Sequence, residues 1–130
     1  MTKRNQRKRF HRACVKWLYL LGLGRYELLT LLDNLNEETD KNSGWHASAK
    51  MESQARYRTI KIIGDEEVIG GMDDEDLDET ACHEVVHAVM APLVEFLDRV
   101  LDELPAKKQD TFIAWRNREV EEVTTHLTTT

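Results

Sequence analysis

Residues 79–93 read ETACHEVVHAVMAPL and contain HEVVH at 83–87. This pattern decides which helix and which site the rest of the chain has to form. Residues at i and i+4 on a helix lie one turn apart on the same side. His83 and His87 can therefore both present a ring nitrogen to one ion, while Glu84 lies about 100° round the helix. The pattern predicts a helix that binds zinc and leaves Glu84 free to act on water as a general base.

The apolar surroundings of this pattern argue against coincidence. From the chain's own content of histidine and glutamate, an H-E-x-x-H pattern arises by chance in about one such chain in fifty. The neighbours of the histidines, however, are strongly apolar, among them Val85, Val86 and Val89. Burying two imidazoles and a carboxylate there without partners costs roughly several kcal/mol. A bound metal removes that cost and a purely apolar core does not, so we expect a metal site.

Composition and charge are those of an ordinary globular chain. Of the 130 residues, 41% are hydrophobic and 32% are charged, which predicts one domain over residues 1–130. The 24 acidic and 18 basic residues give a net charge of -6, which argues against a protein that coats nucleic acid. The basic run within residues 3–12 is a local exception, and we interpret it as the solvated end of a helix.

The sequence predicts a cytoplasmic protein. It has no run of roughly 18 or more apolar residues, and its N-terminal apolar stretch is too short and too often interrupted by charge for a secretory signal. Cys14 and Cys82 lie far apart, which is typical of reduced thiols rather than of a disulfide framework.

The first half of the chain predicts a helix followed by short strands. Apolar residues recur at helical spacing over residues 5–21, and the glycines of LGLG (21–24) end that helix. Residues 25–35 fit either a helix or a strand, and residues 45–52 alternate only weakly between polar and apolar. Residues 56–63, RYRTIKII, are rich in aromatic and β-branched side chains and make the best strand.

An acidic segment leads into the HEVVH helix. Residues 64–76, GDEEVIGGMDDED, read as a turn-rich loop that could act as a lid beside the site, and the acids continue to residue 79. The helix itself is predicted over residues 77–90. Asp76 is its expected N-cap, and Glu79 three residues later completes a capping box.

Two further helical stretches complete the chain. Pro92 fits the first turn of a helix better than a helix interior, so residues 91–104 form either a second helix or a kinked extension. A final helix covers residues 107–128. The predicted fold class is α+β, with an N-terminal helix, a short sheet of about three strands, the HEVVH helix and a C-terminal helix.

A catalytic zinc site needs a third protein ligand and an open fourth position, and the final helix offers candidates. On a helical wheel, one arc is apolar and contains Phe112, Ile113, Val120, Val123 and Leu127. Glu119 and Glu122 fall on the opposite, charged side, whereas Glu121 lies in the middle of an adjoining uncharged arc. Glu121 is therefore the predicted third ligand. A slip of register would give the role to Glu122 or Glu119.

HEVVHAVMAPL (83–93), followed later by VEEVTTHLT (120–128), resembles the small phage and prophage metallopeptidase-like proteins, which are similar to single-domain gluzincins. LGLGRYELLTLL and RYRTIKI take part in the resemblance, so it spans most of the chain. It implies zinc held by His83, His87 and Glu121, with Glu84 as the general base. The aspartate that often follows the gluzincin glutamate is absent, since residue 125 is threonine.

The resemblance also implies an edge strand beside the metal that holds an extended peptide by main-chain hydrogen bonds. Residues 56–63 are the candidate, with a plain core strand as the alternative. The preferred interpretation is a zinc-dependent metallopeptidase of phage type that acts on a peptide or protein substrate, with neither membrane nor nucleic acid as a partner. The alternatives are a catalytically silent zinc-binding structural or regulatory module, and a nucleic-acid-associated factor that uses the basic N-terminus.

Overall fold

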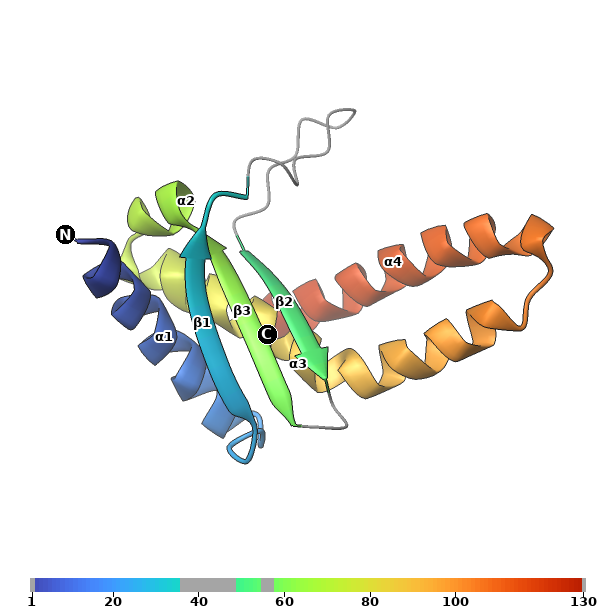
Figure 1. Cartoon of the computed structure of the whole chain (residues 1–130), viewed down its shortest axis with the longest axis horizontal. Coiled ribbons are helices and arrows are strands. Elements are labelled where there is room, and N and C mark those ends of the chain that lie inside the picture. The colour runs from blue at the N-terminus through green and yellow to red at the C-terminus, as the bar shows by residue number, and fades with distance from the viewer. Residues whose placement is uncertain (1, 36–48, 55–57, 130) are drawn as a thin grey trace.

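The computed structural model describes residues 2–35, 49–54 and 58–129 and has the predicted α+β organisation. A three-stranded sheet carries the helices on one face (Figure 1). In chain order the elements are α1 (Lys3–Leu20), β1 (Glu27–Asp33), β2 (Ala49–Gln54), β3 (Thr59–Asp65), α2 (Glu66–Gly70), α3 (Asp74–Asp102) and α4 (Ala106–Thr129). The strand order is β1-β3-β2, with β1 parallel and β2 antiparallel to β3.

The sheet corrects two sequence-based predictions. Residues 25–35 contain strand β1, so the helical alternative is wrong. The strand expected at 56–63 is β3, which begins at Thr59 and lies in the middle of the sheet rather than at its edge. The edge strand that packs against α3 is β2, which extends to Gln54, beyond the weakly alternating 45–52. Residues 45–48 and 56–57 of those two predictions lie outside the described residues.

Helix α1 supplies the core beneath the sheet. It begins at the N-cap Thr2, whose hydroxyl oxygen accepts a hydrogen bond from the Asn5 N–H at 3.2 Å. Phe10, Cys14 and Leu18 recur at intervals of four residues and are buried against the inner face of the sheet and against α3. Cys14 and Cys82 are both free and buried.

The acidic segment is more helical than its sequence predicts. It contains α2 and the first turn of α3, so the expected loop over 64–76 is largely wrong. The N-cap of α3 is Asp73, whose Oδ1 accepts the Asp76 N–H at 2.8 Å, and not Asp76. The predicted capping box between Asp76 and Glu79 is therefore not the start of the helix. The acids of the first turn favour the positive end of the helix dipole.

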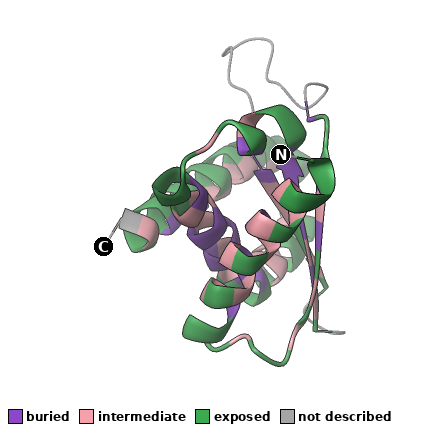
Figure 2. Ribbon diagram, turned by 90° about the vertical axis from the view of Figure 1, so that its left-hand side faces the viewer, coloured by how far each residue is buried: buried purple, intermediate pink, exposed green. Residues whose placement is uncertain are grey.

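Helix α3 continues through Pro92 as one helix to Asp102, so of the two alternatives for 91–104 the extension is right and the separate helix is wrong. The ring of Pro92 is exposed, and its missing N–H costs the chain one helical hydrogen bond without interrupting the helix. The chain then turns back at Pro105, and α4 runs antiparallel to α3 (Figure 1). Buried residues lie where α3 passes between the sheet and the other helices (Figure 2). No helix in the described part of the chain is both long and apolar enough to cross a membrane.

Candidate metal centre

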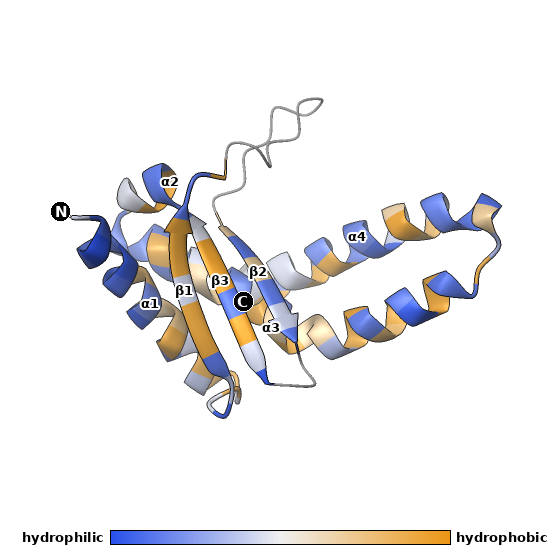
Figure 3. Cartoon of the chain, viewed as in Figure 1, coloured by the Kyte–Doolittle hydropathy of each residue, from blue (hydrophilic) through white to orange (hydrophobic). Residues whose placement is uncertain are grey.

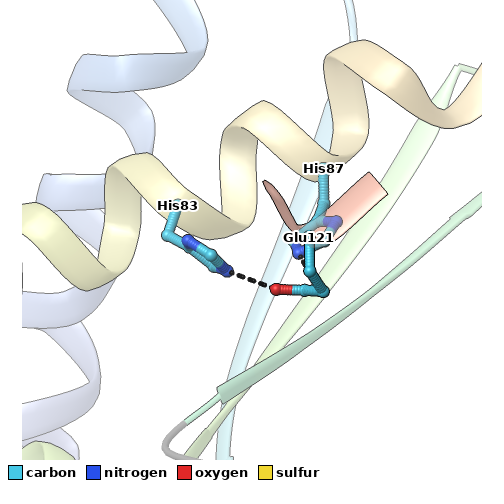
Figure 4. A group of neighbouring side chains, drawn as sticks. All are labelled: His83, His87 and Glu121. Carbon is cyan, nitrogen blue, oxygen red and sulfur yellow. Dashed lines mark ion pairs between the residues drawn. The ribbon is translucent and has the colours of Figure 1, made fainter. Parts of the chain in front are cut away.

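Two helices bring His83, His87 and Glu121 together (Figure 4). The histidines lie one turn apart on α3, and the glutamate reaches them from α4. His87 Nε2 is 3.0 Å from Glu121 Oε1, and His83 Nε2 is 3.5 Å from Glu121 Oε2. One ligand atom from each side chain lies within 4.8 Å of the others, and the described residues form no second cluster of this kind.

The donor set and its spacing fit a zinc ion. Two imidazole nitrogens and one carboxylate oxygen are a ligand set that zinc uses at catalytic sites. A tetrahedral ion with bonds of about 2.0–2.1 Å holds its ligand atoms roughly 3.3 Å apart. The two distances from the Glu121 oxygens to the histidine nitrogens, 3.0 and 3.5 Å, lie on either side of that value. The His83 and His87 rings are 4.9 Å apart and inclined at 77°, so their edges converge without stacking.

The electrostatics at His87 favour its neutral ring. Burial lowers the pKa of His87 below its usual value, and the positive charge of His83 acts in the same direction. The Glu121 carboxylate opposes this by favouring protonated His87. Because only a deprotonated imidazole nitrogen can bind a metal, a lowered pKa favours ligation near neutral pH. The Glu121 side chain is 59% exposed, which leaves one side of the cluster open to solvent.

Glu84 occupies a different environment from Glu121. The residue is only 6% exposed, and it lines the same cleft as His83 and Glu121. Burial raises the pKa of the Glu84 carboxyl to about 7, and the nearby charge of Glu121 adds to the shift. A carboxyl group with this pKa is suited to accept a proton and return it near neutral pH.

Glu121, which the helical wheel places in the uncharged arc of α4, lies beside the two histidines. The apolar arc of the same helix is less buried than its composition suggests. Two members of the apolar arc, Val123 and Leu127, are 44% and 49% exposed. The residue that α4 buries completely is Thr124, whose hydroxyl lies 3.4 Å from Met90 Sδ on α3. A small side chain lets the two helices approach closely at this level, and among the described elements α3 is the main packing partner of α4. Glu119 and Glu122 are exposed.

Sequence reasoning did not identify the cleft beside the cluster. Its lining includes Asp76 and Glu79, which precede His83 on α3 by seven and four residues. Those intervals place all three on one side of the helix. A helical wheel of α3 therefore shows from the sequence that the two acids lie on the same side as His83. The sequence interpretation instead placed these acids in a turn-rich loop, with a lid beside the site as one possible role, and in a capping box.

A scan against models of known protein families finds no match, and comparisons with curated proteins and with solved structures find no significant match either.

Proposed function

We propose that the protein is a zinc-dependent metallopeptidase, similar in plan to a minimal gluzincin of the small phage type. One observation carries the proposal. Glu121 of α4 faces the two histidines of HEVVH, and Glu84 is buried in the cleft beside them. Two ligands on one helix, a third on another helix and a separate buried carboxyl are the set of groups that metal-assisted hydrolysis requires.

In this proposal His83, His87 and Glu121 hold the zinc ion. The bound metal supplies a Lewis acid that lowers the pKa of water and polarises a carbonyl group. Glu84 accepts the proton of the attacking water and passes it to the departing amine nitrogen. The raised pKa of Glu84 makes both transfers accessible near neutral pH.

Strand β2 would orient the substrate. It is an edge of the sheet and packs against α3, and its residues Met51 and Ser53 lie in a hollow with His87. The main chain of an extended peptide can pair with such an edge. We propose a peptide or protein substrate held in this way, in the cytoplasm, with no membrane or nucleic acid taking part.

The second candidate is a zinc-binding module without hydrolysis. It is favoured by Thr125, which stands where the resemblance leads one to expect aspartate. In zinc sites a carboxylate that accepts a hydrogen bond from the other ring N–H of a ligating histidine fixes the orientation of that ring, and its loss weakens activity. A zinc ion between α3 and α4 would still stabilise their packing, because the two helices meet at the cluster.

The experiment that separates these candidates is a cleavage assay with zinc-loaded protein and a broad peptide library, read by mass spectrometry. We expect metal-dependent cleavage by the wild type. Glu84→Gln is expected to keep its zinc and to cleave at least about 100-fold more slowly, since it loses the general base. Glu75→Gln, an exposed acid in the first turn of the same helix, is the matched control and should cleave at the wild-type rate.

Cleavage by Glu84→Gln at the wild-type rate would remove Glu84 from the mechanism. Zinc binding without cleavage of any library peptide would favour the silent module.

A further inference from the structure

A cleft of about 460 Å³ opens beside His83. Its walls come from α3, α4 and the start of β2, and four acids lie in its lining: Asp76, Glu79, Glu84 and Glu121. His83 is the one titratable base among the lining residues that the structure describes. The cleft therefore has a negative wall next to the site of proposed hydrolysis.

Ion pairs neutralise one side of the α3 N-terminus and leave the cleft side charged. Asp74 pairs with Arg9 of α1 at 2.8 Å, and Asp78 pairs with Lys16 of the same helix. Asp76 and Glu79 face the cleft and form no ion pair within the described part of the chain. Helix α1 supplies the bases on the other side, whereas among the described elements none supplies a Lys or Arg to the cleft lining.

Glu84 points independently to a ligand in the cleft. The residue is only 6% exposed, and it lines the cleft. Among the described residues no hydrogen bond or ion pair reaches its carboxyl group. A carboxylate that is largely withdrawn from water and has no protein donor gains from a donor or cation that a ligand brings.

The spacing along α3 fits one amino-acid side chain of a bound peptide. At about 1.5 Å per residue, Glu79 lies roughly 6 Å before His83 along the helix axis, and Asp76 lies roughly 10 Å before it. A peptide residue spans about 3.3 Å when extended. A lysine or arginine one or two residues from the cleaved bond therefore has its charged group at the level of these acids.

The opposite side of the cluster has a different character. A hollow of about 250 Å³ next to His87 is lined mainly by apolar side chains, Met51, Ala91, Val94 and Val120, with Ser53 and Glu95 as its polar members. The two hollows thus differ in charge on either side of the histidine pair. That difference gives a bound peptide a preferred direction.

We propose that the cleft on the His83 side is a specificity site for a cationic group of the substrate, a lysine or arginine side chain held by Asp76 and Glu79. This inference rests on the proposed function for its substrate class, a peptide. It adds which side chain the peptide carries and on which side of the metal that side chain lies.

The test is equilibrium binding, measured by fluorescence anisotropy with zinc-loaded Glu84→Gln protein, which keeps the probes intact. The probes are two labelled, N-acetylated alanine-based nonapeptides that carry either arginine or its neutral isostere citrulline at three alternate positions. We expect the arginine peptide to bind roughly five- to tenfold more tightly, as two partly exposed charge pairs allow. The preference should weaken as salt is raised.

Asp76→Asn combined with Glu79→Gln should reduce this ratio to about 1. Glu75→Gln combined with Glu119→Gln removes two exposed acids outside the cleft and should leave the ratio unchanged. The inference is overturned if the two peptides bind equally, if neither binds, or if the preference survives the loss of both cleft acids. A citrulline peptide with a free N-terminus is the third probe. Tight binding of that probe alone would assign the cleft to an α-ammonium group and overturn the side-chain assignment.

Cleavage is measured separately, with wild-type protein. An arginine preference in binding without any cleavage would refute the peptidase and leave the cation site standing. Cleavage without an arginine preference would support the peptidase and refute the cation site. The same binding ratio can be measured on protein that takes up no zinc, because the acid wall belongs to the chain itself.

Discussion

The two halves of α3 lie in different environments. From Asp74 to Ala91 the helix packs between α1, β2 and α4, and this half contains all eight of its buried residues. From Pro92 to Asp102 it projects past β2 beside α4 and contains none (Figure 1). The histidines and Glu84 all belong to the first half. A site whose ligand atoms must stay within a few tenths of an ångström is thus built where packing holds the helix on several sides.

The distal half differs in what it leaves exposed. Leu93 and Phe96 are 54% and 57% exposed, and Trp115 on α4 is 59% exposed. Hydrophobic and hydrophilic residues are interspersed along the outer parts of both helices (Figure 3). This region contributes less to the free energy of unfolding than the first half does, because exposed apolar side chains gain little from folding.

The largest expected effect is on the free energy of unfolding, when the substitution of a phenylalanine in the core is compared with that of one in the distal half. Phe10 is fully buried in the core formed with the first half of α3, so Phe10→Ala should lower the free energy of unfolding by about 3–5 kcal/mol. Phe96→Ala in the distal half should cost less than about 1 kcal/mol. Urea denaturation measures both. Equal losses would show that the two halves are equally packed.

The next effect concerns pH in the metal-free protein. The pKa of Glu84 is raised by burial from 4.5 to about 7, so the folded state holds this proton where the unfolded state has lost it. Stability from this group is complete below pH 4.5 and is lost as the pH rises to 7, by roughly 3 kcal/mol. His87 acts in the opposite sense, since its lowered pKa removes stability as the pH falls through its usual range.

Glu84→Gln isolates the first of these contributions. With a chelator present, the difference in unfolding free energy between the variant and the wild type should grow between pH 4.5 and 7 in favour of the variant. A difference that does not change with pH would mean that Glu84 is not buried as a carboxyl group.

A smaller effect is expected at the junction of the two halves. Pro92→Ala restores one helical N–H in the middle of α3 at an exposed position and should raise the free energy of unfolding by about 1–3 kcal/mol. Thermal denaturation measures the change. A loss of stability would indicate that the proline ring packs against something that matters to the fold.

Local patterns predicted the parts of the fold that depend on helical periodicity. Apolar residues at helical spacing predicted the first helix, whose buried residues are Phe10, Cys14 and Leu18. The arcs of the final helix separated Glu121 from Glu119 and Glu122. The pairing of His83 with His87 followed from their interval alone. These features depend on neighbours within two turns, which a sequence contains.

The errors arose where distant parts of the chain decide the outcome. Asp73, Asp74 and Asp76 are all good helix caps, and only the surrounding packing selects Asp73. The central place of β3 depends on which strands pair, and the continuation of α3 through Pro92 depends on its contact with α4. The acids Asp76 and Glu79 line a cleft only because α4 lies across the site.

The most direct test of the metal centre is the zinc content of the purified protein and of four variants, together with their zinc affinity after chelation. The wild type should carry about one zinc per chain. His83→Ala and Glu121→Ala should lose most of the affinity, because each removes a ligand atom from a cluster that spans no more than 4.8 Å. Glu119→Ala and Glu122→Ala, exposed neighbours on the same helix, should change it by no more than about 0.5 kcal/mol. A wild type that contains no zinc and takes up none would contradict the metal centre, and with it the proposed hydrolase.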